Sequence, residues 1–272
     1  MDRRRCSANL GKLCQGLEDY AKANPSGIPS DPSGCAERLS DSLYLAHSTS
    51  DANFTRICAS GYLVSASRRA ASRGRALPPQ RTEVLMGTDG SVFFYVSPFR
   101  YPNTGSGLLF AGSLELQHQN DGLATPFDSG GLLRIFTLPN SAESPQEFLA
   151  RHEMPIPEHR RYLRMSMGQL FHKAEDYVEG LQPHRPGPIG LTGGDYRRWT
   201  HEVRIPDRVL VRSTHLQAAF APLARTARDP EIRRFFGWCA GKGVDHIAFD
   251  TPRGREFETL QKTCLDYVRR LY

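Results

Sequence analysis

Residues 43–63 of this chain read LYLAHSTSDANFTRICASGYL, a pattern in which a strand passes directly into a short helix. The pattern predicts a strand over residues 42–46 and a helix over residues 51–60. Ser50 is suited to the N-cap position, and Gly61 is suited to the left-handed backbone that ends many helices. The buried face of the predicted helix holds Phe54, Ile57 and Cys58.

Three polar residues lie at this joint between strand and helix. His47 and Thr49 follow the predicted strand, close to the N–H groups that the first helical turn leaves unpaired, and such a joint can hold a polar ligand. An imidazole and a hydroxyl can bind ribose hydroxyls or an amide, while Asn53 can fix the turn. The alternative is structural: Thr49 and Asn53 cap the helix, and His47 is an ordinary half-buried histidine.

The rest of the chain mixes strands and helices without regular alternation, which favours an α+β fold over a doubly wound sheet. Further strands are predicted over residues 91–97, 132–138 and 200–206, and helices over residues 6–23, 229–243 and 255–271. A helical region is predicted over residues 144–181, interrupted at MPIPEH. Residues 1–40, which include a Pro- and Gly-rich stretch, are predicted to form an N-terminal extension, and residues 41–272 the main domain, with a long insertion over residues 101–195.

The composition predicts a cytoplasmic protein and permits an anionic partner, although the Arg-rich segment can equally be a solvated loop. The net charge is +6 and the isoelectric point is about 9.1, which permits binding to nucleic acid or to a phosphate-bearing cofactor. No Asp or Glu occurs between Ala52 and Thr82, a stretch that holds Arg56, Arg68, Arg69, Arg73, Arg75 and Arg81. The six cysteines show no C-x-x-C spacing, and no apolar run is long enough for a signal peptide or a membrane span. Neither a membrane partner nor a metal is expected.

A second candidate site lies in the sequence THEVRIPDRV, residues 200–209. In a strand, Glu202 and Arg204 share one face, which places a carboxylate beside a guanidinium. Such a carboxylate can stabilise the positive charge that develops when a glycosidic bond breaks, or it can be half of a surface ion pair. In SVFFYVS, residues 91–97, Tyr95 can present its ring to a planar ligand such as nicotinamide, although core packing is the default for an aromatic strand.

Together, these stretches resemble the DarT-type ADP-ribosyltransferases, NAD-dependent toxins that modify nucleic acid. The first resembles the family motif H-x-T-x-x-x-N-apolar-x-x-I followed by G-x-L, through His47, Thr49, Asn53, Phe54, Ile57, Gly61 and Leu63. The second resembles the strand V-P-F-Y-F-x-P-R, through Val92, Phe94, Tyr95 and Pro98, with Phe99 standing between Pro98 and Arg100. The third is similar to the strand A-E-V-x-V that carries the family's catalytic glutamate, here Glu202.

The resemblance implies a split mixed sheet, catalysis by Glu202, and an NAD pocket formed by His47, Thr49, Asn53 and Tyr95. The family's NAD-contacting arginine would be one of Arg68, Arg69, Arg75 and Arg81, and the position of Arg81 just before the second strand favours it. The resemblance further implies transfer of ADP-ribose to a base of DNA or RNA, in a toxin or anti-phage role with a possible antitoxin partner. The alternatives are a NAD glycohydrolase that uses water as acceptor and a non-catalytic module that binds nucleic acid.

A serine protease is a rival interpretation. TPFDSGGLL, residues 125–133, is similar to the G-D-S-G-G-P motif of chymotrypsin-like enzymes, which would make Ser129 the nucleophile and His47 the base, with Asp89 or Asp121 to orient it. Phe127 and Leu132 break that motif, and the chain lacks the regular short strands of a double barrel. DSGG is more simply a tight turn near the pocket.

Overall fold

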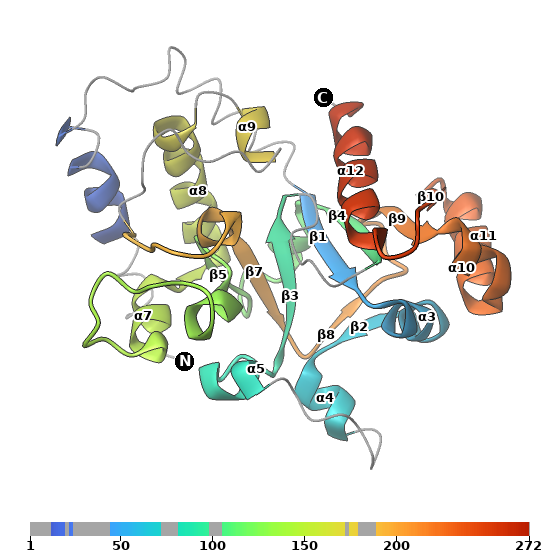
Figure 1. Cartoon of the computed structure of the whole chain (residues 1–272), viewed down its shortest axis with the longest axis horizontal. Helices are drawn as coiled ribbons and strands as arrows, with labels where there is room; N and C mark the ends of the chain where they lie inside the picture. The colour runs from blue at the N-terminus through green and yellow to red at the C-terminus, as the bar shows by residue number, and fades with distance from the viewer. Residues whose placement is uncertain are drawn as a thin grey trace.

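The structure is a computed structural model of the whole chain, shown in Figure 1. It describes residues 12–19, 22–23, 44–71, 81–97, 105–171, 174–178 and 189–271. Most of the predicted extension over residues 1–40 lies outside the described residues, as do Arg73, Arg75, Pro98 and Arg100.

An eight-stranded sheet organises the fold, and it is mostly antiparallel (Figure 1). Its spatial order is β10 (Asp245–Phe249), β9 (Leu216–Pro222), β4 (Ser106–Ala111), β1 (Tyr44–Thr49), β3 (Ser91–Val96), β7 (Glu202–Pro206), β5 (Leu123–Thr125) and β6 (Met154–Pro155). β9 and β10 run parallel, and the other neighbours run antiparallel. A second sheet pairs β2 (Tyr62–Val64) with β8 (Arg208–Leu210). The mixed sheet confirms the predicted α+β class.

Helices flank the sheet along its length. They are α3 (Asp51–Ser60), α4 (Ala66–Ala71), α5 (Arg81–Met86), α6 (Ser113–Gln117), α7 (Pro145–His152), α8 (Ile156–Leu170), α9 (Ala174–Val178), α10 (Leu223–Arg228), α11 (Pro230–Lys242) and α12 (Glu256–Arg269), with 3₁₀ helices η2 (Ser129–Leu133) and η3 (Tyr196–Trp199). α12 packs on β4, β9 and β10, α8 packs on β5 and β6, and α11 packs against α3. No helix in the described part of the chain is both long and apolar enough to cross a membrane.

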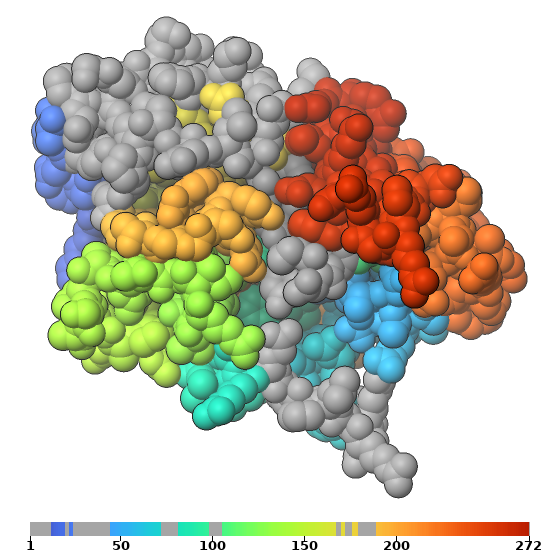
Figure 2. Space-filling model, in the orientation of Figure 1, coloured from blue at the N-terminus to red at the C-terminus, as the bar shows by residue number. Residues whose placement is uncertain are grey.

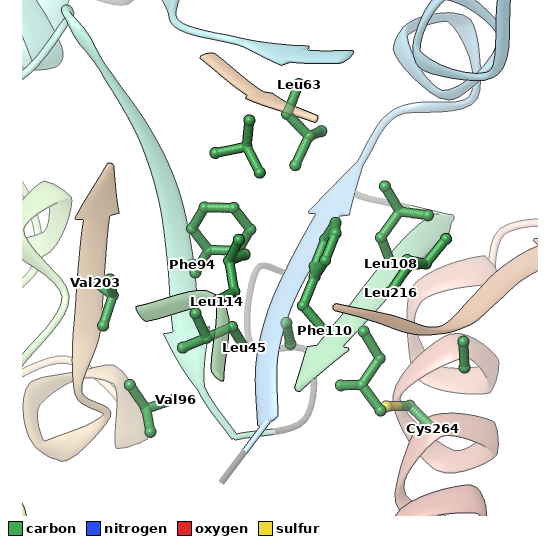
Figure 3. Close-up of a cluster of buried hydrophobic side chains, with 14 of the residues drawn as sticks. Leu45, Leu63, Phe94, Val96, Leu108, Phe110, Leu114, Val203, Leu216 and Cys264 are labelled. Carbon is green, nitrogen blue, oxygen red and sulfur yellow. The ribbon is translucent and has the colours of Figure 1, made fainter. Parts of the chain in front are cut away.

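The main hydrophobic core lies against the centre of the sheet. Leu45, Phe94 and Phe110 come from the adjacent strands β1, β3 and β4, and the Phe94 and Phe110 rings meet edge to face at 5.7 Å (Figure 3). Cys264 of α12 closes this cluster from the helical side. Leu13 and Leu17, in the helical stretch 12–19 near the N-terminus, also belong to this core. Burial of these large apolar side chains is the main force that holds the strands in register.

The central sheet opens between β1 and β3. β1 pairs with β4 along its whole length, but it pairs with β3 only at Leu45↔Val96 and Ala46↔Tyr95. β3 meanwhile stays paired with β7 as far as Ser91. The two strands therefore diverge beyond Ala46, as Figure 1 shows, and the small sheet of β2 and β8 lies beyond the opening. A sheet that splits in its middle exposes backbone and side chains that a continuous ladder would cover.

The predicted strand over residues 132–138 is wrong. The chain forms η2 there, because the Asp128 side chain accepts a hydrogen bond from the Gly130 N–H and starts a 3₁₀ turn. A side chain at Gly131 would collide with the Phe136 ring, so the turn needs glycine at this position. The apolar residues of the segment fill a second core cluster with Met86, Phe127, Phe148 and Leu149 instead of pairing in a sheet.

Candidate active site

A cavity of about 890 Å³ occupies the opening between β1 and β3. Its wall is built by β1, α3, β2, α4, α5 and β3 and, on the other side, by η2, η3 and the start of β7. A volume of this size accommodates a ligand larger than a single base or sugar. The predicted site residues His47, Thr49, Asn53, Tyr95 and Glu202 all line it.

His47 and Thr49 lie at the C-terminal end of β1, which extends to Thr49 and not only to Ala46 as predicted, and α3 begins at Asp51. Ser50 occupies the N-cap position without making a side-chain capping bond, and Gly61 ends α3 with a φ of 74°. Thr49 is buried, and the Asn53 side-chain oxygen accepts a hydrogen bond from Arg56 Nη1 at 3.2 Å. Asn53 therefore positions an arginine at the cavity wall rather than capping the helix.

His47 bridges the two separated strands. Its Nδ1 lies 2.9 Å from the Phe93 carbonyl oxygen, which can only accept, so Nδ1 carries the proton. Burial lowers the pKa of His47 to about 4, and the nearby charge of Arg69 also lowers it, so the ring is neutral at pH 7. In this tautomer, Nε2 is an acceptor, which suits a hydroxyl or an amide N–H of a ligand.

Glu202 begins β7 and is paired in the sheet with Tyr95 on one side and Thr125 on the other. Directly paired residues project to the same face, so Tyr95 and Glu202 share one wall of the cavity. The sequence correctly placed Glu202 and Arg204 on one face, with Arg204 Nε 3.7 Å from Glu202 Oε1. The alternative, a surface ion pair, is wrong because Glu202 is only 2% exposed.

The segments that bury Glu202 come from far along the chain. In Figure 2 the orange segment that leads into β7 lies against the yellow-green segment around η2 and α7. The two segments are joined by a bridge between Thr137 and Thr192 and by a hydrogen bond from the Asp128 N–H to the Arg197 carbonyl at 2.9 Å. They cover the face of β7 that would otherwise meet solvent.

This cover brings two residues to the site that sequence reasoning did not assign to it. Ser129 is 1% exposed, and its Oγ donates a hydrogen bond to Glu202 Oε1 at 2.6 Å. Asp128 is 5% exposed, and its Oδ2 accepts a hydrogen bond from the Tyr95 hydroxyl at 3.0 Å. Arg197 Nη1 lies 3.8 Å from the same oxygen. The only sequence signal for this group was the DSGG turn.

The surroundings of Glu202 favour its protonated form. Burial and, second to it, the negative charge of Asp128 raise the pKa of Glu202 to about 8, against the lowering effects of Arg204 and of the hydrogen bond from Ser129. Burial also raises the pKa of Asp128, against the lowering effect of Arg197. The pKa of the Tyr95 hydroxyl lies well above its usual value, chiefly because of burial, so Tyr95 acts as a neutral donor.

Arginines surround the cavity on several sides. The lining includes Arg56, Arg68, Arg69, Arg134, Arg197 and Arg208. Arg68 forms an ion pair with Asp207, and Arg208 lies over the Tyr62 ring at 5.1 Å. Arg81 is exposed at the start of α5 and is not among the residues that line the cavity, so its role stays a prediction. Arg75 lies outside the described residues.

The geometry rejects the serine protease interpretation. The Ser129 hydroxyl donates to a carboxyl group, not to a histidine, and the His47 Nδ1 donates to a backbone carbonyl. Asp121 faces His118 on the surface. The three chemical groups of a nucleophilic triad are therefore not assembled around Ser129.

No protein-family model matches this chain, and no curated protein matches it. Among solved structures it is similar to DarT from Thermus sp. 2.9 in complex with ADP-ribosylated single-stranded DNA, with 9% identity and a TM-score of 0.43, over 82% of this chain and 96% of that one. It is also similar to the same protein in complex with NAD⁺, with 10% identity and a TM-score of 0.40, over 76% of this chain and 96% of that one. We therefore infer function from the cavity and its side chains.

Proposed function

We propose that this protein is an NAD-dependent ADP-ribosyltransferase in which Glu202 is the catalytic residue. The observation that carries the proposal is the buried carboxyl group of Glu202 on the wall of a cavity that also contains a neutral His47 and several arginines. A buried carboxylate opposite a sugar C1′ is suited to stabilise the positive charge that appears as a glycosidic bond breaks. The arginines are suited to a diphosphate.

The roles of the remaining residues follow from their hydrogen-bonding capacity. The Nε2 acceptor of His47 and the Thr49 hydroxyl bind ribose hydroxyls or the carboxamide, and the Tyr95 ring packs beside the nicotinamide. Glu202 binds the hydroxyl of the nicotinamide ribose and stabilises the positive charge that develops on this ribose as nicotinamide leaves. We assign binding of the diphosphate to Arg69 and not to Arg81, because Arg69 lines the cavity and its positive charge lowers the pKa of His47.

The acceptor that best fits the charge distribution is a nucleic acid. Arg56, Arg68, Arg134 and Arg208 place positive charge around the cavity on both of its sides. Such a ring of arginines attracts a phosphate backbone, and the resulting affinity falls steeply with salt concentration. Transfer of ADP-ribose to a base of DNA or RNA, as a toxin or in anti-phage defence, is the activity that we propose.

The test uses NAD labelled on the adenylate phosphate. The purified protein is incubated with this NAD and single-stranded DNA, RNA or a cell extract, in parallel with the Glu202→Gln variant. Label that enters one polymer with the wild type and not with the variant supports the proposal and names the acceptor class. Release of free ADP-ribose alone would identify a glycohydrolase. If no NAD is consumed and salt-sensitive binding of nucleic acid is unaffected by NAD, the protein is a binding module and the proposal fails.

A further inference from the structure

Asp128 has surroundings that stabilise a negative charge in spite of its burial. Its Oδ1 accepts a hydrogen bond from the Gly130 N–H at 2.9 Å, and its Oδ2 accepts one from the Tyr95 hydroxyl at 3.0 Å. Arg197 Nη1 lies 3.8 Å from Oδ2. Two hydrogen bonds and a nearby guanidinium favour the ionised form of Asp128 and oppose the rise in its pKa that burial causes.

Asp128 lies beside Glu202 on the cavity wall. Tyr95, which is paired with Glu202 in the sheet, donates its hydroxyl to Asp128, and Ser129, which follows Asp128 in the chain, donates its hydroxyl to Glu202. The negative charge of Asp128 also raises the pKa of Glu202. Two carboxylates side by side in a buried site repel each other, so they lose their protons in two separate steps that belong to the pair.

Each of the other charged and polar groups around the pair contacts either Glu202 or Asp128. Glu202 receives the hydrogen bond from Ser129 and lies beside Arg204, whose other partner is Glu153 at 2.5 Å. Asp128 has Arg197, which is itself tied to Asp195 by a hydrogen bond of 2.9 Å. Each arginine is thus shared with a second carboxyl group, but Asp128 accepts two hydrogen bonds whereas Glu202 accepts one, from Ser129. The proton of the pair therefore resides on Glu202.

From this geometry we propose that Asp128 acts on the reaction through Glu202. Before NAD binds, the two carboxyl groups together hold one proton. Binding of the positively charged nicotinamide ring then expels that proton to solvent. The inference rests on the proposed function and deepens it, because it couples NAD binding to the ionisation of the catalytic group. The cation of the bound ring compensates for the second negative charge. Glu202 is then already ionised when the glycosidic bond breaks, and the acceptor's proton returns to the pair after transfer.

The first experiment needs no NAD and no activity. Protein labelled with ¹³C at the side-chain carboxyls of Asp and Glu is titrated by NMR, and Glu202→Gln assigns the Glu202 signal. In the wild type the Glu202 midpoint is expected at about pH 8. Asp128→Asn removes a negative neighbour and should lower the midpoint by about one pH unit or more. Ser129→Ala, from the same turn, removes a donor and should raise it. A midpoint that Asp128→Asn leaves unchanged would overturn the proposal.

The second experiment measures protons released on binding. Binding of carba-NAD⁺, which carries the same pyridinium cation, is followed by calorimetry at pH 7 in buffers of different ionisation enthalpy. The wild type should release about one proton per molecule bound. Asp128→Asn should release about half a proton or less, because a midpoint lowered by about one pH unit or more leaves Glu202 at least half ionised at pH 7. Binding by the wild type without proton release would refute the coupling. A shared proton seen by NMR together with no binding of carba-NAD⁺ would leave the pair intact and reject the proposed function instead.

Discussion

Replacing Glu202 by Gln removes the carboxyl group that becomes negatively charged when NAD is bound, with almost no change in shape. The Gln side-chain oxygen can still accept the hydrogen bond that Ser129 donates to Glu202 at 2.6 Å. Glu202 is 2% exposed, so solvent screens its charge weakly. A cation about 4 Å from a carboxylate, in an effective dielectric of about 20, is stabilised by about 4 kcal/mol. That energy corresponds to a loss in rate of about three orders of magnitude.

The affinity for NAD should change much less than the rate. In the empty cavity Glu202 is protonated at pH 7, because its pKa is raised to about 8. The carboxyl group therefore has to lose its proton before it attracts the bound nicotinamide ring, and this cost offsets much of the attraction in the ground state. We expect the Kd for NAD to change by less than about tenfold while kcat falls by about a thousandfold.

Single-turnover kinetics with labelled NAD and calorimetric binding of NAD separate these two quantities. Glu258→Gln, a carboxyl-to-amide change on the exposed surface of α12, is the matched control and should retain wild-type rates. The assignment of Glu202 would be refuted if Glu202→Gln weakened NAD binding tenfold or more while turnover per bound NAD stayed intact. Equal rates for Glu202→Gln and the wild type would refute it as well.

Four further outcomes are expected. Because the pKa of Glu202 is raised in the folded protein, the folded state binds more protons than the unfolded state between about pH 4.5 and pH 8. The free energy of unfolding should therefore fall as pH rises through this range. Urea unfolding should show a smaller fall for Glu202→Gln, and the difference should be a few kcal/mol at about 1.4 kcal/mol per pKa unit. The wild-type kcat/KM should rise with pH towards about 8, and a flat pH profile would contradict the need for an ionised Glu202. Tyr95→Phe removes a donor from buried Asp128 and should lower the free energy of unfolding by about 1–3 kcal/mol, measured by the same urea titration. Arg69→Ala should raise the Kd for NAD about tenfold, because it removes one charge-assisted hydrogen bond. Arg81→Ala should change this Kd by less than about twofold. A larger effect of Arg81→Ala than of Arg69→Ala would assign the diphosphate to Arg81.

The joint at residues 43–63 could be predicted because its determinants are local. The helical bounds at residues 51–60, the buried face and the stop at Gly61 all depend on neighbours within one or two turns. The first half of β1, Tyr44 to Ala46, is a short local run of apolar residues, and His47 and Thr49 follow it in the same strand. His47 and Thr49 were therefore found from sequence, and both line the cavity.

The sequence predicted a turn at DSGG near the pocket, but it could not predict the contacts of Asp128 with Tyr95 and of Ser129 with Glu202. The place of this turn depends on the register of β5 with β7, in which Thr125 lies opposite Glu202, and on the return of the chain over β7 a few residues later. Ser129 and Glu202 are separated by 73 residues, and nothing in either segment encodes their register. The burial of Glu202 was missed for the same reason, since the covering segments are remote in sequence.

The opening of the sheet and the chemistry of His47 have one structural origin. Where β1 leaves β3, the Phe93 carbonyl loses the ladder partner that a continuous pair of strands would provide, and a partly buried carbonyl needs another donor. The His47 Nδ1 supplies that donor at 2.9 Å, which fixes the tautomer and turns Nε2 into an acceptor. Burial lowers the pKa of the ring to about 4, so the acceptor persists at physiological pH. The separation of the strands that creates the cavity thus also determines which hydrogen-bonding group the cavity offers to its ligand.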